Sequence, residues 1–578
     1  MMMIALSLVM TTTLWSYRAL FFSEEEDWGL VGEWDDRANF VDNDLVRKPL
    51  SWALFVEMWR ATRVNVYEPL GWLFKAMVQG LAAKEEASGL LEVAARAHRL
   101  ATLLMHCACA CLLFLVTVGL LEQLTKKKHY FPALCGTLMW ALHPMHAEVV
   151  GWPSAQPYAL ATCFSLAALL SHLHLLKYQK YYVLGPFFYA LATLSKSVTI
   201  PLPATVFAID LLSLRRVKEI FKHLAGYALV TLIMVPVTVR ANGLGGDPSA
   251  DVIRIEGFEM RCAKALITVF FCLGNAIWPI NLRPHYVLVP IDTDELQVTL
   301  TAAILIVSFS LSRIVAENDF SYSAVLIHVA ASFLPSCGLV QHGMIQKGGD
   351  RYGYIPLLAI APVVAAFLIG LEEKTETRGG ADPDKMRPDH RRRIHRVLIA
   401  MGVAAVVTCE SQLTSRQVLL WRNDETLLRG AIEKDPSDWR VLDTLAEHLM
   451  AKGDPKQEAP LFIERALRSV ELMDLSRSAK ETVFRAKNLV LLGKADEGCL
   501  LFQEAKIAYP ENPMALNNAA ICELRAPEQR EFQLANFELA LARAERPEHE
   551  RTVATNLQAF LTWRQAGYQG QFDGALLY

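Results

Sequence analysis

Long apolar runs separated by short polar segments dominate the chain up to about residue 413. Each run is close to the roughly 20 residues that a helix needs to cross a bilayer. A further run at 263–280 contains Lys264 and Pro279, which favours a helix lying in the membrane interface. We therefore expect an all-α membrane bundle over 1–413 with about 11 spans. The expected spans are 3–22, 100–122, 131–147, 157–176, 181–195, 198–214, 223–240, 297–314, 322–340, 353–371 and 396–413.

The composition is typical of a membrane protein. Of the 578 residues, 53% are hydrophobic, and the mean hydropathy of +0.24 is high for a soluble protein. The formal net charge of −3 averages two unlike parts, and we expect no nucleic-acid partner. The run 3–22 lacks basic leading residues and a small-residue cleavage site, so we expect a retained helix and not a removed signal. Six cysteines in apolar runs are expected to be buried and unpaired: Cys107, Cys109, Cys111, Cys135, Cys163 and Cys272.

The basic clusters predict the orientation of the spans, because cytoplasmic loops carry an excess of Lys and Arg. The clusters lie at 126–128, 177–180, 215–218 and 391–393. All four are cytoplasmic if the N-terminus is cytoplasmic and 263–280 does not span. If 263–280 spanned, the last cluster would lie outside. We therefore predict lumenal loops at 23–99 and 241–296, a cytoplasmic polar loop at 372–395, and a lumenal C-terminal domain.

A repeated pattern begins after about residue 421, where the composition becomes that of a soluble helical domain. Pro436, Pro510 and Pro547 are spaced by 74 and 37 residues, and 74 is twice 37. This period predicts three to four tetratricopeptide-like repeats over 421–578, stacked into a short α-solenoid that suits an extended peptide. A plain helical bundle is the alternative. Small residues are expected at turns and close helix crossings: Gly453, Gly493, Ala446, Ala466, Ala505 and Ala540.

An acidic segment, which contains Asp35 and Asp36, follows the first apolar run. A hydroxyl nucleophile must lose a proton while it attacks a sugar carbon. A carboxylate at the membrane surface can accept that proton, or it can orient a cation on a phosphate leaving group. Two adjacent acids are also common in any solvated loop. The acid pair is therefore a candidate catalytic site whose alternative is an ordinary surface loop.

A second motif, His143, His146 and Glu148, falls at the predicted lumenal end of an apolar run. Residues three apart share a helix face, and two imidazoles with a carboxylate can hold a metal or contact an anion. Pro144 predicts a helix end or a broken helix. We favour contact with an anionic ligand. A divalent metal stays open as a cofactor, and a helix end wetted by interfacial water is the simplest alternative.

Further charged residues fall on the same predicted face. Lys196 lies between two apolar runs, where it can snorkel or pair with a lipid phosphate. Arg351 can bind phosphate oxygens in a fork geometry. Adjacent residues rarely pair well, so we expect Arg351 to find a partner other than Asp350. Arg240 adds positive charge to the predicted lumenal loop.

These segments, in this order, resemble the transmembrane and tetratricopeptide-repeat O-mannosyltransferases of the endoplasmic reticulum, including the cadherin-targeting type and its microbial relatives. The resemblance covers nearly the whole chain. Each motif is weak alone, and their order and spacing carry the likeness. The matching segments are Trp34-Asp-Asp-Arg-Ala-Asn-Phe-Val-Asp-Asn43, Ala141-Leu-His-Pro-Met-His-Ala-Glu148, Leu194-Ser-Lys196, Gly338-Leu-Val-Gln-His-Gly343 and Asp350-Arg-Tyr-Gly-Tyr-Ile-Pro356, followed by the repeats.

The resemblance implies a C-type glycosyltransferase fold and a dolichyl-phosphate-mannose-dependent protein O-mannosyltransferase. The donor would be a polyprenyl-phosphate sugar, and the acceptor a Ser or Thr of a secretory or membrane protein held by the repeats. Asp35 or Asp36 would be the catalytic base. The donor phosphate would contact His143, His146, Lys196 and Arg351, with Glu148, Asp350 and Arg240 in support. The implied location is the endoplasmic reticulum membrane, or the plasma membrane in a prokaryote.

Two departures from the animal enzymes leave the sugar and acceptor open. Glu68 stands where an animal-type Tyr-Arg-Pro-Leu segment has Arg, and the segment after Glu148 lacks a Gly-Arg pair. Two other functions therefore remain as alternatives. One is a membrane-anchored repeat scaffold without catalysis, and the other is a transporter of lipid-linked sugar.

Overall fold

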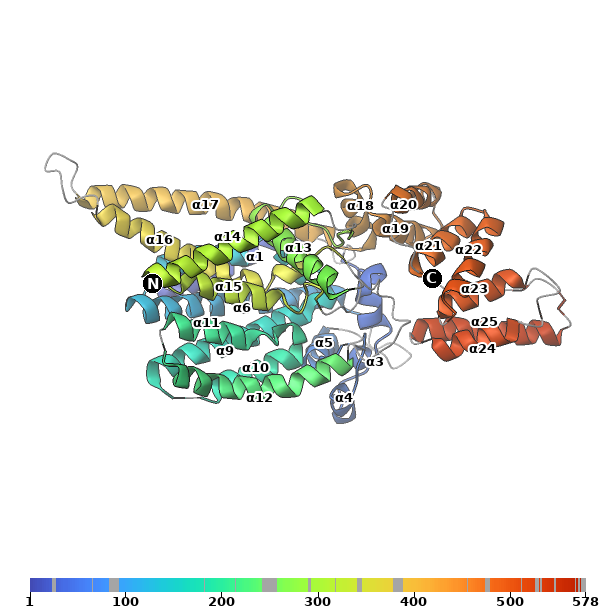
Figure 1. Cartoon of the computed structure of the whole chain (residues 1–578), viewed down its shortest axis with the longest axis horizontal. Helices are drawn as coiled ribbons and strands as arrows, with labels where there is room; N and C mark the ends of the chain where they lie inside the picture. Colours follow the sequence, from blue (N-terminus) through green and yellow to red (C-terminus); the bar gives the residue numbers. More distant parts are fainter. Residues whose placement is uncertain are drawn as a thin grey trace.

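In the computed structural model, the regular secondary structure among the described residues is helical, apart from one isolated β-bridge between Arg63 and Val66 (Figure 1). This confirms the predicted all-α class. The apolar part forms an elongated bundle, and the C-terminal part lies beside one end of it (Figure 1). The described residues are 1–22, 28–64, 66–82, 93–180, 182–213, 215–241, 257–288, 293–317, 319–339, 346–377, 388–454, 456–472, 479–510, 512–524, 530, 533–544, 547–566, 568–569 and 572.

The bundle begins with α1 and ends with α17, and its long helices alternate with short connecting turns. Its α-helices are α1 (Met2–Ser16), α2 (Ala19–Phe22), α3 (Asp44–Arg47), α4 (Trp52–Met58), α5 (Pro69–Ala82), α6 (Ala95–Thr125), α7 (Tyr130–Ala141), α8 (His146–Gly151), α9 (Gln156–Tyr178), α10 (Leu184–Ser195), α11 (Leu202–Leu212), α12 (Val217–Ala241), α13 (Phe258–Ile277), α14 (Thr293–Glu317), α15 (Ser321–Phe333), α16 (Ile360–Thr377) and α17 (Pro388–Leu420). Other helical turns are η2 (Gly32–Val41), η3 (Pro153–Ala155), η4 (Ser197–Thr199), η5 (Asp350–Gly353) and η6 (Pro356–Ala359).

Seven helices among the described residues are long and apolar enough to cross a membrane, by length and composition. They are Ala95–Thr125, Pro153–Tyr178, Val217–Ala241, Phe258–Ile277, Thr293–Glu317, Pro356–Glu373 and Val397–Leu420. Four shorter apolar helices accompany them: Met2–Ser16, Leu184–Ser195, Ser197–Leu212 and Ser321–Phe333. These helices are compatible with a membrane protein.

Three predicted segments differ from expectation. The run 263–280, expected to lie in the interface, belongs to a helix that meets the length and hydropathy of a span. The predicted span 131–147 is a broken helix, because α7 ends at Ala141 and α8 begins at His146. Pro144 lies in this break, as its missing backbone N–H requires. The predicted loop 372–395 is helical at both ends, and 378–387 lie outside the described residues.

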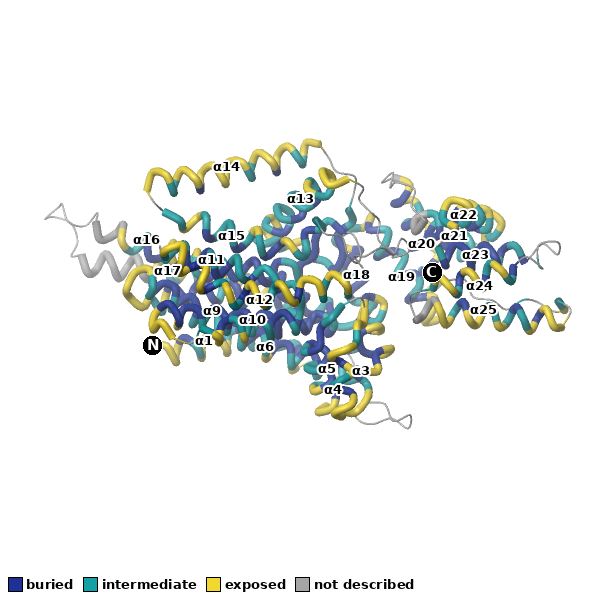
Figure 2. Tube along the Cα trace, turned by 60° about the horizontal axis from the view of Figure 1, so that its bottom comes forward, coloured by how far each residue is buried: buried dark blue, intermediate teal, exposed yellow. Residues whose placement is uncertain are grey.

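Buried and exposed helices differ in a way that fits a lipid environment. The core consists mainly of apolar side chains from α6, α7, α9 and the turns before α16. By contrast, α14 is apolar yet exposed along most of its length (Figure 2). In water such a surface would be costly, whereas acyl chains solvate it. The exposed apolar side chains of α14 include Val298, Ile304, Leu305, Phe309, Leu311 and Val315.

The C-terminal part consists of successive helices that pack in pairs, as the predicted tetratricopeptide-like repeats require. Gly453 and Gly493 have φ of 84° and 81° at the turns between paired helices, a conformation that glycine adopts without strain. Ala446, Ala466, Ala505 and Ala540 are buried, which is consistent with their predicted place between packed helices. The helices are α18 (Asp424–Lys434), α19 (Trp439–Ala451), α20 (Ala459–Leu472), α21 (Ala479–Leu491), α22 (Ala495–Ala508), α23 (Pro513–Glu523), α24 (Gln533–Arg543) and α25 (Pro547–Gln565).

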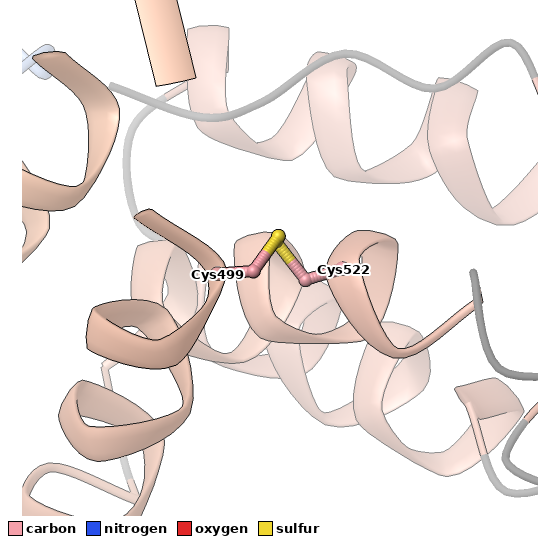
Figure 3. Close-up of a disulfide and its surroundings, with 2 residues drawn as sticks. All are labelled: Cys499 and Cys522. Carbon is pink, nitrogen blue, oxygen red and sulfur yellow. A yellow bond between two sulfur atoms is a disulfide. The ribbon is translucent and has the colours of Figure 1, made fainter. Parts of the chain in front are cut away.

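A disulfide joins two neighbouring helix pairs, α21 with α22 and α23 with α24. It links Cys499 of α22 with Cys522 of α23, with 5.5 Å between the Cα atoms (Figure 3). The six cysteines of the apolar runs are free, and four of them are buried, in line with their predicted packing role.

The segment that contains Asp35 and Asp36, called the acidic loop from here on, meets the repeats at one end of the bundle. Asp424, in the first turn of α18, accepts hydrogen bonds from the backbone N–H groups of Gly32 and Glu33 at 3.2 and 3.0 Å. The rings of Trp152 and Trp421 stack with centroids 5.6 Å apart. One hydrophobic cluster contains side chains from the loop, from the bundle and from α18 to α21. The loop is thus clamped between the two parts of the chain.

Candidate functional site

The two acids of the loop have different environments. Asp36 is fully buried. Its Oδ2 accepts a hydrogen bond from Val31 N at 2.9 Å, and its Oδ1 accepts from Ser154 N at 3.0 Å and Ser154 Oγ at 2.5 Å. Burial raises the pKa of Asp36, and these hydrogen bonds and the Arg99 charge act against that rise. Asp35 is exposed. Asp36 therefore ties the loop to the bundle, whereas Asp35 faces outward.

Arg99, on α6, links three backbone segments in the same region. Its guanidinium donates hydrogen bonds to three backbone carbonyls: Gly151 O at 2.6 Å, Gly29 O at 2.8 Å and Trp421 O at 2.8 Å. These carbonyls belong to the bundle, the acidic loop and the end of α17. A buried arginine with this set of partners fixes three segments relative to one another, because its planar donors have a rigid geometry.

Lys75, on α5, interacts electrostatically with both acids and was not predicted from the sequence. It is buried, and its Nζ donates a hydrogen bond to Asn39 Oδ1 at 2.7 Å. Asn39 in turn donates to the backbone carbonyl of Asp35 at 3.1 Å. Burial lowers the pKa of Lys75 to about 7, although Glu68, Asp36 and Asp35 favour its charged form. Its electrostatic interactions extend from the acid pair to Glu68 and to Lys196.

Lys196 is paired with Glu68. It lies between α10 and η4, and its Nζ is 2.6 Å from Glu68 Oε1. Burial alone would lower the pKa of Lys196, but Glu68 holds it above its ordinary value. The same Nζ lies 4.7 Å from the centroid of the Tyr158 ring. The lysine side chain remains 18% exposed, so it can reach a ligand as well as its partner.

Arg351 is paired with Glu148, which is 203 residues away in sequence. Its backbone N–H and Nη1 donate to the two oxygens of Glu148 at 2.6 and 2.5 Å. Its side chain is 16% exposed and also lies over the ring of Trp152 at 5.2 Å. Asp350 is oriented elsewhere, since it accepts a hydrogen bond from Tyr286 at 2.6 Å. Burial and the nearby Glu148 raise the pKa of Asp350 well above its usual range.

The structure places the two histidines of the motif in other surroundings. His143 Nε2 is 2.8 Å from the backbone carbonyl of Ala276. His146 is buried among aromatic rings, with centroids 4.8 Å from both Trp140 and Tyr354. Neither histidine contacts Lys196 or Arg351 among the described residues, and they form no metal-ligand cluster with Glu148 there. Of the four predicted donor-binding residues, Lys196 and Arg351 are brought together, and the supporting Glu148 pairs with Arg351.

Arg240 ends α12 and is exposed, and no contact among the described residues joins it to this cluster. The residues that join the acids to the cations are instead Lys75, Glu68 and Tyr158. Lys75 lies on an amphipathic helix whose apolar face hides it among core residues, so its charge carries no local signal. Glu68 had a signal, namely its position as a charge reversal in a matching segment.

The resulting arrangement is one polar network at the repeat-bearing end of the bundle. It begins at the exposed Asp35 and continues through Lys75 and Glu68 to Lys196. Lys196 and Arg351 then interact electrostatically. A carboxylate can accept a proton, and two partly exposed cations can bind a phosphate. The network thus combines the groups needed for acid–base chemistry beside an anion.

Comparisons with known proteins leave the family open. No family model matches the chain, and no curated protein matches it. Among solved structures, the chain is similar to one described as the crystal structure of yeast Tom70. The identity is 16%, and the alignment covers 75% of this chain and 92% of that chain, with a TM-score of 0.24. A likeness at that score supports no inference about this chain, so membership of the O-mannosyltransferases stays a prediction.

Proposed function

We propose that this protein is a membrane-embedded glycosyltransferase that moves a sugar from a polyprenyl-phosphate donor to Ser or Thr of a protein. Mannose is the sugar that we expect. The observation that carries the proposal is the polar network just described. It brings an exposed carboxylate and two partly exposed cations together at the end of an apolar bundle. The donor class follows from that setting, because a lipid-linked phosphate reaches such a site from within the bilayer.

Asp35 is the proposed catalytic base. The acceptor hydroxyl forms a bond from its oxygen to the anomeric carbon of the sugar, and the bond from that carbon to the phosphate oxygen breaks. The hydroxyl proton passes to the Asp35 carboxylate, and the polyprenyl phosphate leaves with the bonding electrons. Attack from the face opposite the phosphate inverts the anomeric carbon. Asp36 is the positioning residue, because its carboxylate is already occupied by Val31 and Ser154.

Lys196 and Arg351 are the proposed phosphate ligands. The negative charge on the phosphate grows as it leaves, and preorganised cations stabilise that charge. Both cations already have a carboxylate partner, Glu68 and Glu148 respectively. A bound phosphate therefore competes with these carboxylates or shares the cations with them. Glu148 also holds Arg351 through one hydrogen bond from the guanidinium Nη1 and one from the backbone N–H, which orients the side chain before the donor arrives.

The repeats are the proposed holder of the acceptor protein. Stacked helix pairs of this kind suit an extended peptide. Contacts between Asp424 and the acidic loop tie the first repeat helix directly to the segment that contains Asp35. A peptide lying on the repeats would therefore enter the site beside the base.

The proposed location is the endoplasmic reticulum membrane with the repeats in the lumen. The disulfide between Cys499 and Cys522 supports this orientation, because disulfides persist in oxidising compartments and are rare in the cytosol. The basic clusters at 126–128, 177–180 and 215–218, which precede α13, are predicted on the opposite face and agree with it.

Glycopeptide mass spectrometry of secreted proteins tests the function. Cells without the gene are complemented with the wild-type protein, Asp35→Asn or Asp44→Asn. Asp44 is the matched control, since it lies in the same loop and is exposed, paired with Lys48 at 2.9 Å. We expect hexose on Ser or Thr to return with the wild type and with Asp44→Asn, but not with Asp35→Asn. Full restoration by Asp35→Asn would show that the catalytic assignment is wrong.

Two further measurements separate the alternatives. If removal of 421–578 abolishes partner binding while Asp35→Asn changes nothing, the protein is a scaffold. If lipid-linked sugar crosses vesicle membranes without any acceptor glycosylation, the protein is a transporter.

A further inference from the structure

A second polar cluster lies deep in the bundle, well away from the acidic loop. It consists of His172 on α9, Asp210 on α11 and His223 on α12, and all three side chains are buried. His172 is 14 residues beyond Tyr158 on the same helix, which places it about 21 Å further along the axis. The cluster therefore takes no part in the proposed glycosyl transfer.

The three side chains point their polar atoms at one another. His172 Nε2 is 3.0 Å from Asp210 Oδ1, and His223 Nδ1 is 3.0 Å from Asp210 Oδ2. One ligand atom from each residue lies within 4.8 Å of the other two. The two imidazole rings are nearly perpendicular, at 79°, with centroids 5.5 Å apart. No other group of three metal-ligating side chains among the described residues converges in this way.

We propose that His172, Asp210 and His223 bind one divalent transition-metal ion, with zinc as the expected occupant, which joins α9, α11 and α12. Two imidazoles and one carboxylate form the three-ligand set found in several zinc proteins, where water completes the coordination. The donor set is too rich in nitrogen for magnesium or calcium, which prefer oxygen. The ligands come from three helices, so a bound ion would hold the helices together.

The charge of Asp210 supports an ion. A buried carboxylate is costly unless a positive charge accompanies it. Among the described residues, its ion pairs are made only with the two histidines. Nearby Arg215 directs its guanidinium to the backbone carbonyl of Leu176 at 3.1 Å and not to the carboxylate. A divalent cation would balance the negative charge of Asp210.

Two unsatisfied polar atoms beside the cluster give independent support. The Nδ1 atom of His172 and the hydroxyl of Tyr227 are buried, and neither has a hydrogen-bond partner among the described residues. The rings of these two residues lie edge-on, with their centroids 6.5 Å apart. Buried polar atoms without partners are uncommon, and a missing ion or its bound water is a usual reason. A metal-bound water would give the Tyr227 hydroxyl a partner, and His172 Nδ1, on the ring edge away from the ion, would take a separate outer-shell water, as ligating histidines do in known metal sites.

Metal analysis of the full-length protein tests the proposal. The wild type, Asp210→Asn and His174→Ala are purified in detergent without chelator, and their zinc content is measured by plasma mass spectrometry. His174 is the matched control, because it lies on α9, is exposed, and among the described residues forms a hydrogen bond with the backbone carbonyl of Leu170 but no contact with the cluster. We expect about one zinc ion per chain in the wild type and control, and about tenfold less in Asp210→Asn. Equal zinc content in all three proteins would overturn the proposal.

A second measurement works even if Asp210→Asn fails to fold. Wild-type protein is stripped with a chelator and titrated with cobalt(II), whose visible absorption reports nitrogen and oxygen ligation in a protein site. Saturable absorption, together with recovery of thermal stability on zinc addition, supports the site. Stripped protein that binds no cobalt and keeps its full stability would overturn the proposal and show that hydrogen bonds hold the cluster instead.

Discussion

Replacing each of the two loop acids by asparagine separates a structural from a catalytic role. Asp36→Asn keeps one acceptor oxygen, which can still face Ser154, but it turns an amide NH₂ group toward the N–H of Val31. A buried donor left without an acceptor costs about 1–3 kcal/mol, and hydrogen bonds to a charged group are worth more than neutral ones. Loss of the attraction to Arg99 adds to that cost.

Burial of Asp36 offsets part of this cost. Because burial raises the pKa of Asp36, the ionised carboxylate already carries a desolvation cost that asparagine avoids. We therefore expect Asp36→Asn to lower the free energy of unfolding by about 2 kcal/mol. Asp35→Asn removes an exposed carboxylate and should stay within about 0.5 kcal/mol of the wild type.

Heating followed by fluorescence-detected size-exclusion chromatography measures the difference. Detergent-solubilised wild type, Asp35→Asn and Asp36→Asn are compared by the temperature at which half of each protein remains monodisperse. We expect only Asp36→Asn to shift to lower temperature, and we expect Asp35→Asn to lose sugar transfer while it stays folded. The reverse order of stabilities would refute the assignment of Asp36 as the positioning residue and Asp35 as the base.

Three other substitutions test the polar network and the repeats. Burial lowers the pKa of Lys75 to about 7 from 10.5, so the unfolded chain binds a proton that the folded chain has released between these values. Stability should therefore rise with pH across that window by at most about 1.4 kcal/mol per unit, and Lys75→Met should remove this dependence in thermal melts. Glu68→Gln frees Lys196 from its partner, and we expect the KM for the lipid donor to fall about fivefold. Cys499→Ser breaks the link to Cys522, which closes a 23-residue separation, and should cost about 3 kcal/mol in a denaturant titration.

Each of these has its own contradicting result. A pH dependence equal in wild type and Lys75→Met would assign the titration to another group. An unchanged or higher KM in Glu68→Gln would mean that Lys196 does not bind the donor phosphate. If both cysteines of the wild type react with a maleimide before reduction, the disulfide is absent and the repeats do not face an oxidising compartment.

The sequence alone determined the features that depend on local spacing. Apolar runs of bilayer length predicted the helical membrane bundle, because the length of a spanning helix is set by the bilayer. Pro144 predicted the break between α7 and α8, because proline lacks the backbone N–H that a helix interior needs. Gly453 and Gly493 predicted turns, because glycine tolerates positive φ.

Only the tertiary structure decided which charged residues act together. Asp35 and Asp36 are neighbours with the same chemistry, and they differ because Ser154, from a distant turn, and Arg99, from α6, interact with the buried Asp36. Glu148 and Arg351 are 203 residues apart, and no local pattern links them. The same holds for Lys75, and for His172 with its two partners on other helices. Packing brings such groups together, and packing depends on how whole helices fit against one another and not on the spacing within any one of them.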